Sequence, residues 1–322
     1  MKQRSIFDLN NEQEYTWKSK HIKFFLELPN IGPATVEKII DINPDIDHWN
    51  RDYVADRLSN YKKFLNQLPE EIPKLEDLDD EIVVNFKEDR YPKILNQMQK
   101  GKPLLLWFKG NLNLDIGLAV VGSRKIIPET QSVVEHFIKS FKKKDVSIVS
   151  GLANGVDESA HLSALENNLK TIAVLPSSLD NILPHSNKNL AYEIVENGGL
   201  LVTEYEPGSP RKPENSNYIA RNRIQAGLSK LVFIAQSSIP GVTMTTDKFA
   251  LDFQKLLAVY RSGENFDIEE YKGNKYLLSK IDENFDYKIL KFTKKQIEIF
   301  QNKLALADFS VTEDMDKILE AY

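Results

Sequence analysis

The feature that most constrains the fold is a regular alternation of short apolar runs with helix-length segments between residues 116 and 260. Such runs, rich in β-branched and aliphatic residues, predict buried strands. Strands separated by helices need crossover connections, so the pattern predicts a parallel sheet with helices on both faces and right-handed crossovers. We therefore assign the chain to the α/β class, with an extended Rossmann-like parallel sheet. The expected strands are residues 118–121, 146–149, 172–175, 200–203, 231–235 and 256–259, and the expected helices are 131–141, 158–166, 190–196, 219–227 and 245–253.

The segments that flank this alternation predict further domains. Two more strands, at residues 82–86 and 104–108, follow an acidic linker over residues 69–78. Residues 26–40 are typical of a helix-hairpin-helix element, in which Gly32 permits the turn and Pro33 begins the second helix. Whether this element contacts DNA is left open. We predict a helical (helix-hairpin-helix/SAM-like) domain over residues 1–75, a Rossmann-like domain over 80–262 and a small C-terminal module of undecided fold over 263–322.

Composition excludes several kinds of chemistry. The chain of 322 residues has no Cys, which excludes disulfides, thiolate catalysis and cysteine-ligated zinc. Its five His residues are scattered rather than spaced as metal ligands. No apolar run approaches the roughly 18 residues that a membrane span requires. A cytoplasmic protein without membrane contact is the expectation.

The net charge of -5 argues against a nonspecific nucleic-acid coat, but not against a local basic site. The acidic excess lies largely in residues 70–80 and 264–270. Cations instead gather in or beside the loops that follow the expected strands, which predicts a local basic groove. These cations are Arg124, Lys125, Lys188, Arg211, Lys212, Arg221 and Arg223.

Three short loop motifs lie where the expected strands end. They are Val121-Gly122-Ser123-Arg124, then Ser150-Gly151-Leu152-Ala153-Asn154-Gly155-Val156-Asp157, then Arg221-Asn222-Arg223. Open parallel sheets bind ligands at the carboxyl ends of their strands. Backbone N–H groups at a helix start, together with arginines, form an anion site without a catalytic group. The motifs therefore predict a domain that binds the phosphates of a nucleic acid or nucleotide.

These motifs resemble those of the DNA processing protein A (DprA/Smf) family. The resemblance covers roughly residues 80–260 and includes Tyr91-Pro92, Gly110-Asn111, His161, Pro184, Asn187, Thr203-Glu204-Tyr205 and Ala226-Gly227-Leu228-Ser229. It implies a protein without catalytic activity or cofactor that binds single-stranded DNA in natural transformation. It also implies a homodimer that loads RecA recombinase onto that DNA.

The same resemblance implies DNA-binding roles for individual residues. Ser123 and Arg124 would form the phosphate pocket, with Gly122 allowing close approach of the backbone, and Gly151 and Gly155 would shape the second loop. Lys188 would contact the DNA backbone. Arg221 and Arg223 would line the same groove, with Asn222 orienting them or a base. Because the two arginines are two residues apart on one helix, one could instead pair with Glu204 or Asp157.

Two alternatives involve a nucleotide rather than DNA. Asp157 and His161 are four residues apart and could form an acid–base pair, although a helix-capping Asp and a His satisfied by a neighbouring loop are the favoured interpretation. A nucleotide phosphoribohydrolase of the lysine-decarboxylase-like group would need a Pro-Gly-Gly-x-Gly-Thr segment before a catalytic Glu. Residues 240–246 have one of those glycines, and the next acidic residue is Asp247. A nucleotide-binding sensor needs the same phosphate loops and stays open.

Overall fold

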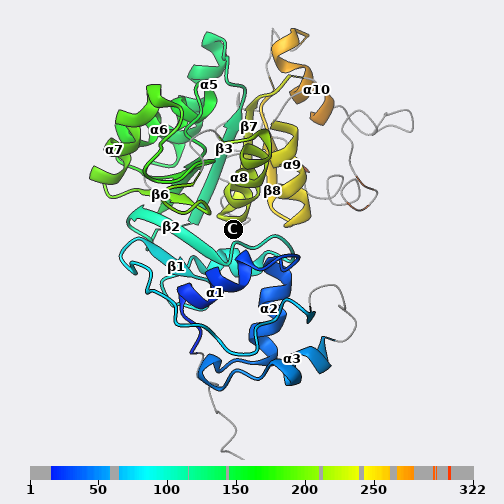
Figure 1. The fold of residues 1–322 in the computed structure, drawn as a ribbon. Coiled ribbons are helices and arrows are strands. Elements are labelled where there is room, and N and C mark those ends of the chain that lie inside the picture. The colour runs from blue at the N-terminus through cyan, green and yellow to red at the C-terminus, as the bar shows by residue number, and fades with distance from the viewer. Residues whose placement is uncertain are drawn as a thin grey trace, which may run out of the picture.

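The computed structural model contains a nine-stranded sheet with helices on both faces (Figure 1). The strand order is β1-β2-β6-β5-β4-β3-β7-β8-β9. The predicted α/β class and Rossmann-like parallel sheet are confirmed, since all pairs from β6 to β9 are parallel. The structure describes residues 16–58, 65–114, 116–142, 145–209, 213–238, 243–261, 267–278, 293, 295 and 304–305.

The strands follow the predicted apolar runs closely. Each of the six predicted strands of the alternation is present and extends by at most three residues beyond its apolar run. In chain order, the strands are β1 (Val83–Asn85), β2 (Leu105–Gly110), β3 (Ile116–Gly122), β4 (Val146–Ser150), β5 (Lys170–Val174), β6 (Leu200–Thr203), β7 (Ser229–Gln236), β8 (Leu256–Val259) and β9 (Leu304–Ala305).

Two strands at one edge run against the others. β1 pairs antiparallel with β2, and β2 pairs antiparallel with β6, with Trp107 opposite Thr203. The alternation of strands and helices did not predict this arrangement, because residues 82–108 contain no long crossover helix between their strands. The edge pair extends the sheet toward the N-terminal helices (Figure 1).

Side chains alternate between the two faces of the sheet. Along β3, Leu118 and Val120 pack in one cluster with α5 and α6, whereas Ala119 and Val121 pack in another with α8 and α9. α7 covers β5 and β6 on the same side as α6. The sheet is thus buried on both faces, as a parallel sheet requires. The helices are α5 (Pro128–Ser140), α6 (Val156–Glu166), α7 (Lys188–Glu196), α8 (Asn215–Gly227) and α9 (Thr243–Asp252).

The N-terminal helices α1 (Ser19–Glu27), α2 (Pro33–Ile42) and α3 (Arg51–Arg57) contain the predicted helix–turn–helix. Pro33 begins α2, as expected, but the turn's left-handed residue is Asn30, with φ of 60°, rather than Gly32. Asn tolerates this conformation better than most residues, which explains its presence there. The helices and the sheet share one hydrophobic cluster, which contains both Phe25 and Leu106.

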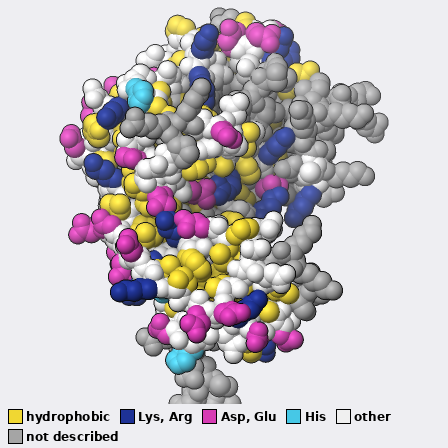
Figure 2. Space-filling view, viewed as in Figure 1, with side chains coloured by type: hydrophobic (Ala, Val, Ile, Leu, Met, Phe, Trp, Pro, Cys, Tyr) yellow, Lys and Arg dark blue, Asp and Glu magenta, His cyan; other side chains and the backbone are white. Residues whose placement is uncertain are grey.

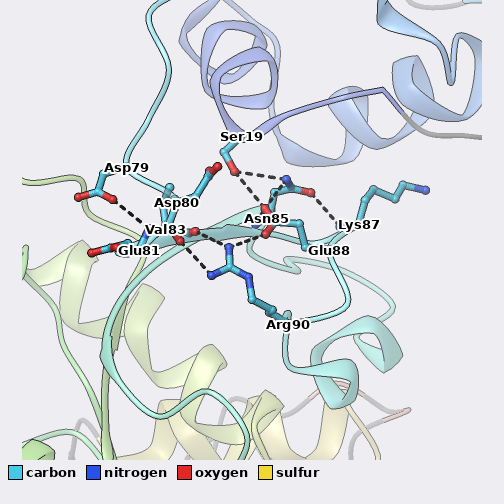
Figure 3. A network of polar contacts seen from close by, with 9 residues as sticks. All are labelled: Ser19, Asp79, Asp80, Glu81, Val83, Asn85, Lys87, Glu88 and Arg90. Atoms are coloured by element: carbon cyan, nitrogen blue, oxygen red, sulfur yellow. Dashed lines mark hydrogen bonds and ion pairs between the residues drawn. The ribbon is translucent and has the colours of Figure 1, made fainter.

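A polar network fastens α1 to β1 and the turn after it (Figure 3). The Ser19 hydroxyl donates to Glu88 Oε1 at 3.3 Å, and Asn85 Nδ2 donates to both residues. Arg90 forms an ion pair with the same Glu88 and donates to the carbonyl oxygen of Asp80. The network therefore joins the helical residues to the edge strand through side chains of both parts.

A short segment after β8 folds back onto the end of β7. It comprises the 3₁₀ turn η5 (Glu269–Tyr271) and α10 (Lys272–Leu278). Asn274 is buried, accepts a hydrogen bond from Ser237 N at 2.6 Å and donates to the carbonyl oxygens of Ala235 and Tyr260. This segment therefore forms part of the rim around the strand ends. Most of the predicted C-terminal module, and the apolar run at residues 297–306 except for β9, lies outside the described residues.

Within the described ranges, we find no helix with the length and apolar character needed to cross a membrane.

Candidate functional site

A crevice lies at the carboxyl ends of β3 and β7. Successive connections after β3 build the sheet in one direction through β4, β5 and β6, whereas β7 and β8 lie on the other side of β3. Such a reversal opens a crevice where α/β proteins bind ligands. Here it has a volume of about 490 Å³ and is lined by the loop after β3, the start of α6, the middle of α8 and η5. We call it the switch-point crevice.

Two exposed cations and one aromatic ring line the crevice. The Arg124 guanidinium carbon lies 5.0 Å from the centre of the Tyr218 ring, and Lys125 is the next residue. Both cations are exposed, and neither has an ion-pair partner among the described residues. A guanidinium beside an aromatic face can contact a phosphate while the ring stacks on a base.

Arg221 lies deeper, in the floor of the crevice. It is only 5% exposed, its Nη1 lies 3.4 Å from Asp157 Oδ2, and it donates to Gln225 Oε1 at 2.7 Å. Burial lowers the pKa of Arg221, while the Asp157 carboxylate opposes that shift. Arg221 Nε and Gln225 Nε2 have no hydrogen-bond acceptor within the described residues. The floor therefore contains two buried donor groups without acceptors among the described residues, and the Asp157 carboxylate offsets the guanidinium charge.

The second loop turns its amides inward rather than toward a ligand. The amides of Gly151 and Ala153 both donate to Asp157 Oδ2, at 3.2 and 3.4 Å. Val156 N donates to Ser123 O, and Ser123 N donates to Gln236 O. The expectation that backbone N–H groups of these loops form the anion site is wrong for these four amides, because each already has an acceptor. These four amides are therefore not available to an anion.

The loop glycines are explained by close packing. A Cβ on Gly151 would lie 1.0 Å from Arg221 Nη1, so the glycine makes room for the buried guanidinium. Gly155 has a φ of 84°, and a Cβ there would lie 2.5 Å from Ser123 O. A Cβ on Gly122 would lie 2.4 Å from Val156 Cγ2. Gly151 and Gly155 thus shape the second loop, and Gly122 lets the first loop approach it.

Three of the residues that the sequence placed in the site make other contacts or lie outside the crevice. Arg223 points to the other side of α8, where it forms an ion pair with Glu204 and donates to Gly101 O at 2.7 Å. Asn222 lines the crevice, but its Nδ2 donates to Thr245 Oγ1 at 2.8 Å. Lys188 is exposed at the start of α7, away from the crevice lining. Both arginines of the third motif are therefore paired with carboxylates, where the sequence suggested one.

Acidic side chains also reach the crevice. Glu269 and Glu270 of η5 line it opposite the loop after β3. The expectation that the acidic segments lie elsewhere is therefore wrong for residues 269 and 270, because the segment after β8 folds back onto β7. Figure 2 shows Lys and Arg side chains interspersed with Asp and Glu over the visible face. Specific side chains, rather than a uniformly basic surface, would have to select an anion here.

The two candidate acid–base residues, Asp157 and His161, make structural contacts. His161 is fully buried, its Nδ1 lies 2.7 Å from Thr171 Oγ1, and burial lowers its pKa to about 3. Asp157 holds the second loop and Arg221. Both residues thus make structural contacts, but not the expected ones. Gly155 rather than Asp157 is the N-cap residue of α6, and His161 contacts strand β5 rather than a loop.

Asp247 lies behind the crevice rather than in it. Its carboxyl group is fully buried on α9, has no hydrogen-bond partner among the described residues, and has its pKa raised by burial. The adjacent Thr246 lines the crevice, whereas Asp247 does not. The catalytic Glu of a hydrolase must contact the ligand, and Asp247 in the compared position does not line the crevice. Residues 240–242 of the compared segment lie outside the described residues.

Sequence reasoning missed Tyr218 and Gln236. Tyr218 precedes Arg221 by three residues on α8, so both occupy one face of the helix, and this spacing could have indicated it. Gln236 accepts from Thr130 Oγ1 at 2.6 Å and donates to Lys125 O at 2.8 Å, which holds the loop after β3. No local pattern indicates Gln236, because its partners are more than 100 residues away.

The residues that line the crevice fall within the part of the chain that matches a known protein family. The sequence model of the family described as DNA recombination-mediator protein A matches residues 82–286. Protein Smf of Borreliella burgdorferi is 32% identical over 230 residues, which cover 68% of this chain and 71% of that protein. DNA processing protein DprA of Streptococcus pneumoniae is 39% identical over 167 residues, 51% of this chain and 57% of that protein.

Solved structures share the fold. The crystal structure of DprA from Streptococcus pneumoniae matches 94% of this chain and 98% of its own, with a TM-score of 0.66 and 24% identity. The structure of DprA from Helicobacter pylori, described for its single-stranded DNA binding mode, matches 74% of this chain and 97% of its own, with a TM-score of 0.57 and 24% identity. On the extent of the sequence matches, the chain belongs to the DNA recombination-mediator protein A family.

Proposed function

We propose that this chain binds single-stranded DNA in the switch-point crevice and acts as a recombination mediator rather than as an enzyme. The observation that carries the proposal is the exposed Arg124 guanidinium beside the Tyr218 ring at the carboxyl ends of β3 and β7. A single strand offers both a phosphate for the cation and an unstacked base for the ring, whereas the bases of a duplex are stacked on one another and offer the ring no free face. Family membership and the single-stranded DNA binding of the Helicobacter pylori relative support it.

In this proposal the predicted residues have unequal roles. Arg124 and Ser123 face the phosphate, Lys188 contacts the DNA backbone, and Arg221, whose charge Asp157 offsets, supports the crevice floor from beneath. Asn222, Arg223, Gly122, Gly151 and Gly155 act by holding the loops and α8 in place. No cofactor is required, because the proposed activity is binding.

The proposed cellular role extends beyond DNA binding in the crevice. We infer that the chain is a cytoplasmic homodimer that helps load RecA recombinase onto incoming single strands during DNA uptake. The support is family membership alone, since the surfaces for RecA and for a second copy have no recognised motif in this chain. A mass measurement by light scattering at micromolar concentration tests the dimer, and a monomer mass would contradict it.

The binding test compares labelled single-stranded DNA, duplex DNA and mononucleotides by fluorescence anisotropy over a salt series. We expect the single strand to bind most tightly, with affinity that falls steeply as salt rises and little sequence preference. A crevice of about 490 Å³ is also large enough for a nucleotide. Saturable mononucleotide binding with weak DNA binding would therefore replace this proposal with the nucleotide-sensor or phosphoribohydrolase alternative.

A further inference from the structure

A second aromatic ring flanked by cations lies on α7, outside the switch-point crevice. Tyr192 is 39% exposed, unusual for so large a side chain in this structure. The ammonium nitrogens of Lys188 and Lys109 lie 5.8 and 5.7 Å from the centre of its ring. Lys188 begins α7, and Lys109 lies near the end of β2. We call these three residues the α7 patch.

Packing does not account for the exposed ring. Ala191 and Ile194 supply the buried face of α7 and pack against β5 and β6, so Tyr192 lies on the solvent side of the helix. Its hydroxyl makes no hydrogen bond to a described residue. Neither flanking lysine forms an ion pair within the described ranges. The patch therefore offers an exposed aromatic ring and two cations that have no ion-pair partner among the described residues.

Side-chain contacts tie the start of α7 to the loops of the crevice. Asn187 Nδ2, one residue before Lys188, donates to Leu152 O at 3.0 Å. The Ser186 hydroxyl donates to Asn154 Oδ1 at 3.0 Å. Both acceptors belong to the second loop, which packs against the loop that contains Arg124. The α7 patch and the crevice are therefore held in a defined relationship.

A second groove adjoins the crevice. Arg124 lines both, and Asn154 and Ser186 also line this groove. The side of the groove formed by α5 and α6 has acidic residues, among them Glu135 and Glu158. These carboxylates would repel a strand that leaves Arg124, which favours a path past the uncharged Asn154 and Ser186, the latter two residues before Lys188.

We infer that the α7 patch is a second contact site for the same single strand that enters the switch-point crevice. This inference rests on the proposed function. The Tyr192 ring would stack on one base, and Lys109 and Lys188 would contact the phosphates on either side of it. Stacking on an aromatic ring flanked by cations is how proteins bind single strands without reading their sequence. Glu193 is exposed next to Tyr192 and weakens the attraction without removing it.

The test uses the full chain and labelled oligothymidylates of two lengths, roughly 5 and roughly 20 nucleotides, chosen around the usual site sizes of single-strand binders. The short strand can fill the crevice alone, whereas the long strand can also reach the α7 patch. We expect Tyr192→Ala to weaken binding of the long strand about 5- to 10-fold and to leave the short strand unchanged. Tyr192→Phe should bind both as the wild type does, because the ring is retained.

Two further variants separate the patch from general surface effects. Lys109→Gln should reduce the number of counterions released on long-strand binding by about one, measured as the slope of the logarithm of affinity against the logarithm of salt concentration. Tyr53→Ala is the matched control, because Tyr53 is an exposed ring with a stacked arginine, on α3 in the N-terminal helices. Wild-type affinity of Tyr192→Ala for the long strand, or an equal loss in Tyr53→Ala, would overturn the inference while leaving the proposed function intact. Failure of the wild-type chain to bind any single strand would instead overturn the proposed function.

Discussion

Arg221 Nη1 lies 3.4 Å from Asp157 Oδ2, a buried contact between residues 64 positions apart that joins α8 to the second loop. Asp157 also accepts hydrogen bonds from the amides of Gly151 and Ala153. One carboxylate thus fixes the loop and balances the charge beneath the switch-point crevice. Two residues that sequence reasoning placed among the ligand-binding and acid–base candidates are therefore partners in holding the site together.

We expect Asp157→Ala to lower the free energy of unfolding by about 3–5 kcal/mol, because it leaves the buried Arg221 charge without a partner. Urea unfolding followed by circular dichroism measures this change. Adding Arg221→Met should restore part of the loss, since the double variant has no unpaired charge. Simple additivity of the two single losses would mean that the residues do not act as a pair.

We expect Arg124→Ala to weaken single-stranded DNA binding about tenfold and to reduce the salt slope by about one, because one phosphate contact is lost. The melting temperature should stay unchanged, since Arg124 is exposed and has no ion pair among the described residues. The matched control is Arg57→Ala, which removes another arginine stacked on a tyrosine, at 3.5 Å on α3. Anisotropy titrations that gave both variants the same affinity would remove Arg124 from the site.

We expect Glu270→Gln to strengthen DNA binding about two- to fivefold at low salt, because it removes a negative charge from the crevice wall. The gain should shrink as salt rises, since salt screens repulsion between the carboxylate and the phosphates. Glu76→Gln, an exposed substitution in the acidic linker, serves as the control for net charge. Equal gains in the two variants would show that total charge, rather than the crevice wall, sets the affinity.

The buried His161 should make the protein less stable as the pH falls. Burial lowers its pKa from 6.5 to about 3, so below pH 6.5 the unfolded chain takes up a proton that the folded chain excludes. The part of the free energy of unfolding that depends on neutral His161 is fully present above pH 6.5. It is lost as the pH falls toward 3, at up to about 1.4 kcal/mol per pH unit.

The variant His161→Asn isolates this effect, because Asn cannot titrate and keeps a donor for Thr171. Urea unfolding at several pH values between 6.5 and 4 should show a shallower loss of stability in the variant than in the wild type. Parallel curves would mean that His161 does not contribute to the acid sensitivity.

Short-range patterns determined most of the α/β core. The six apolar runs between residues 118 and 259 became β3 to β8 with small shifts at their ends, since strand propensity and burial on both faces act over a few residues. The same patterns placed the first two loop motifs at the carboxyl ends of strands, where a parallel sheet presents them to a ligand. The antiparallel pairing of the edge strands was not predicted, because no local sequence pattern indicates which strands will pair with each other.

The sequence by itself determined the order of strands and helices, the positions of the glycine loops and the resemblance that names the family. Only the tertiary structure decided which arginines are exposed and which are buried in ion pairs. Arg124 and Arg221 both belong to loop motifs, yet Arg124 is exposed beside Tyr218 whereas Arg221 is buried against Asp157. The fold also brought Glu270 to the crevice wall. The physical reason is that charge pairing and burial depend on residues distant in the chain, whereas strands, turns and glycine conformations depend on residues close by.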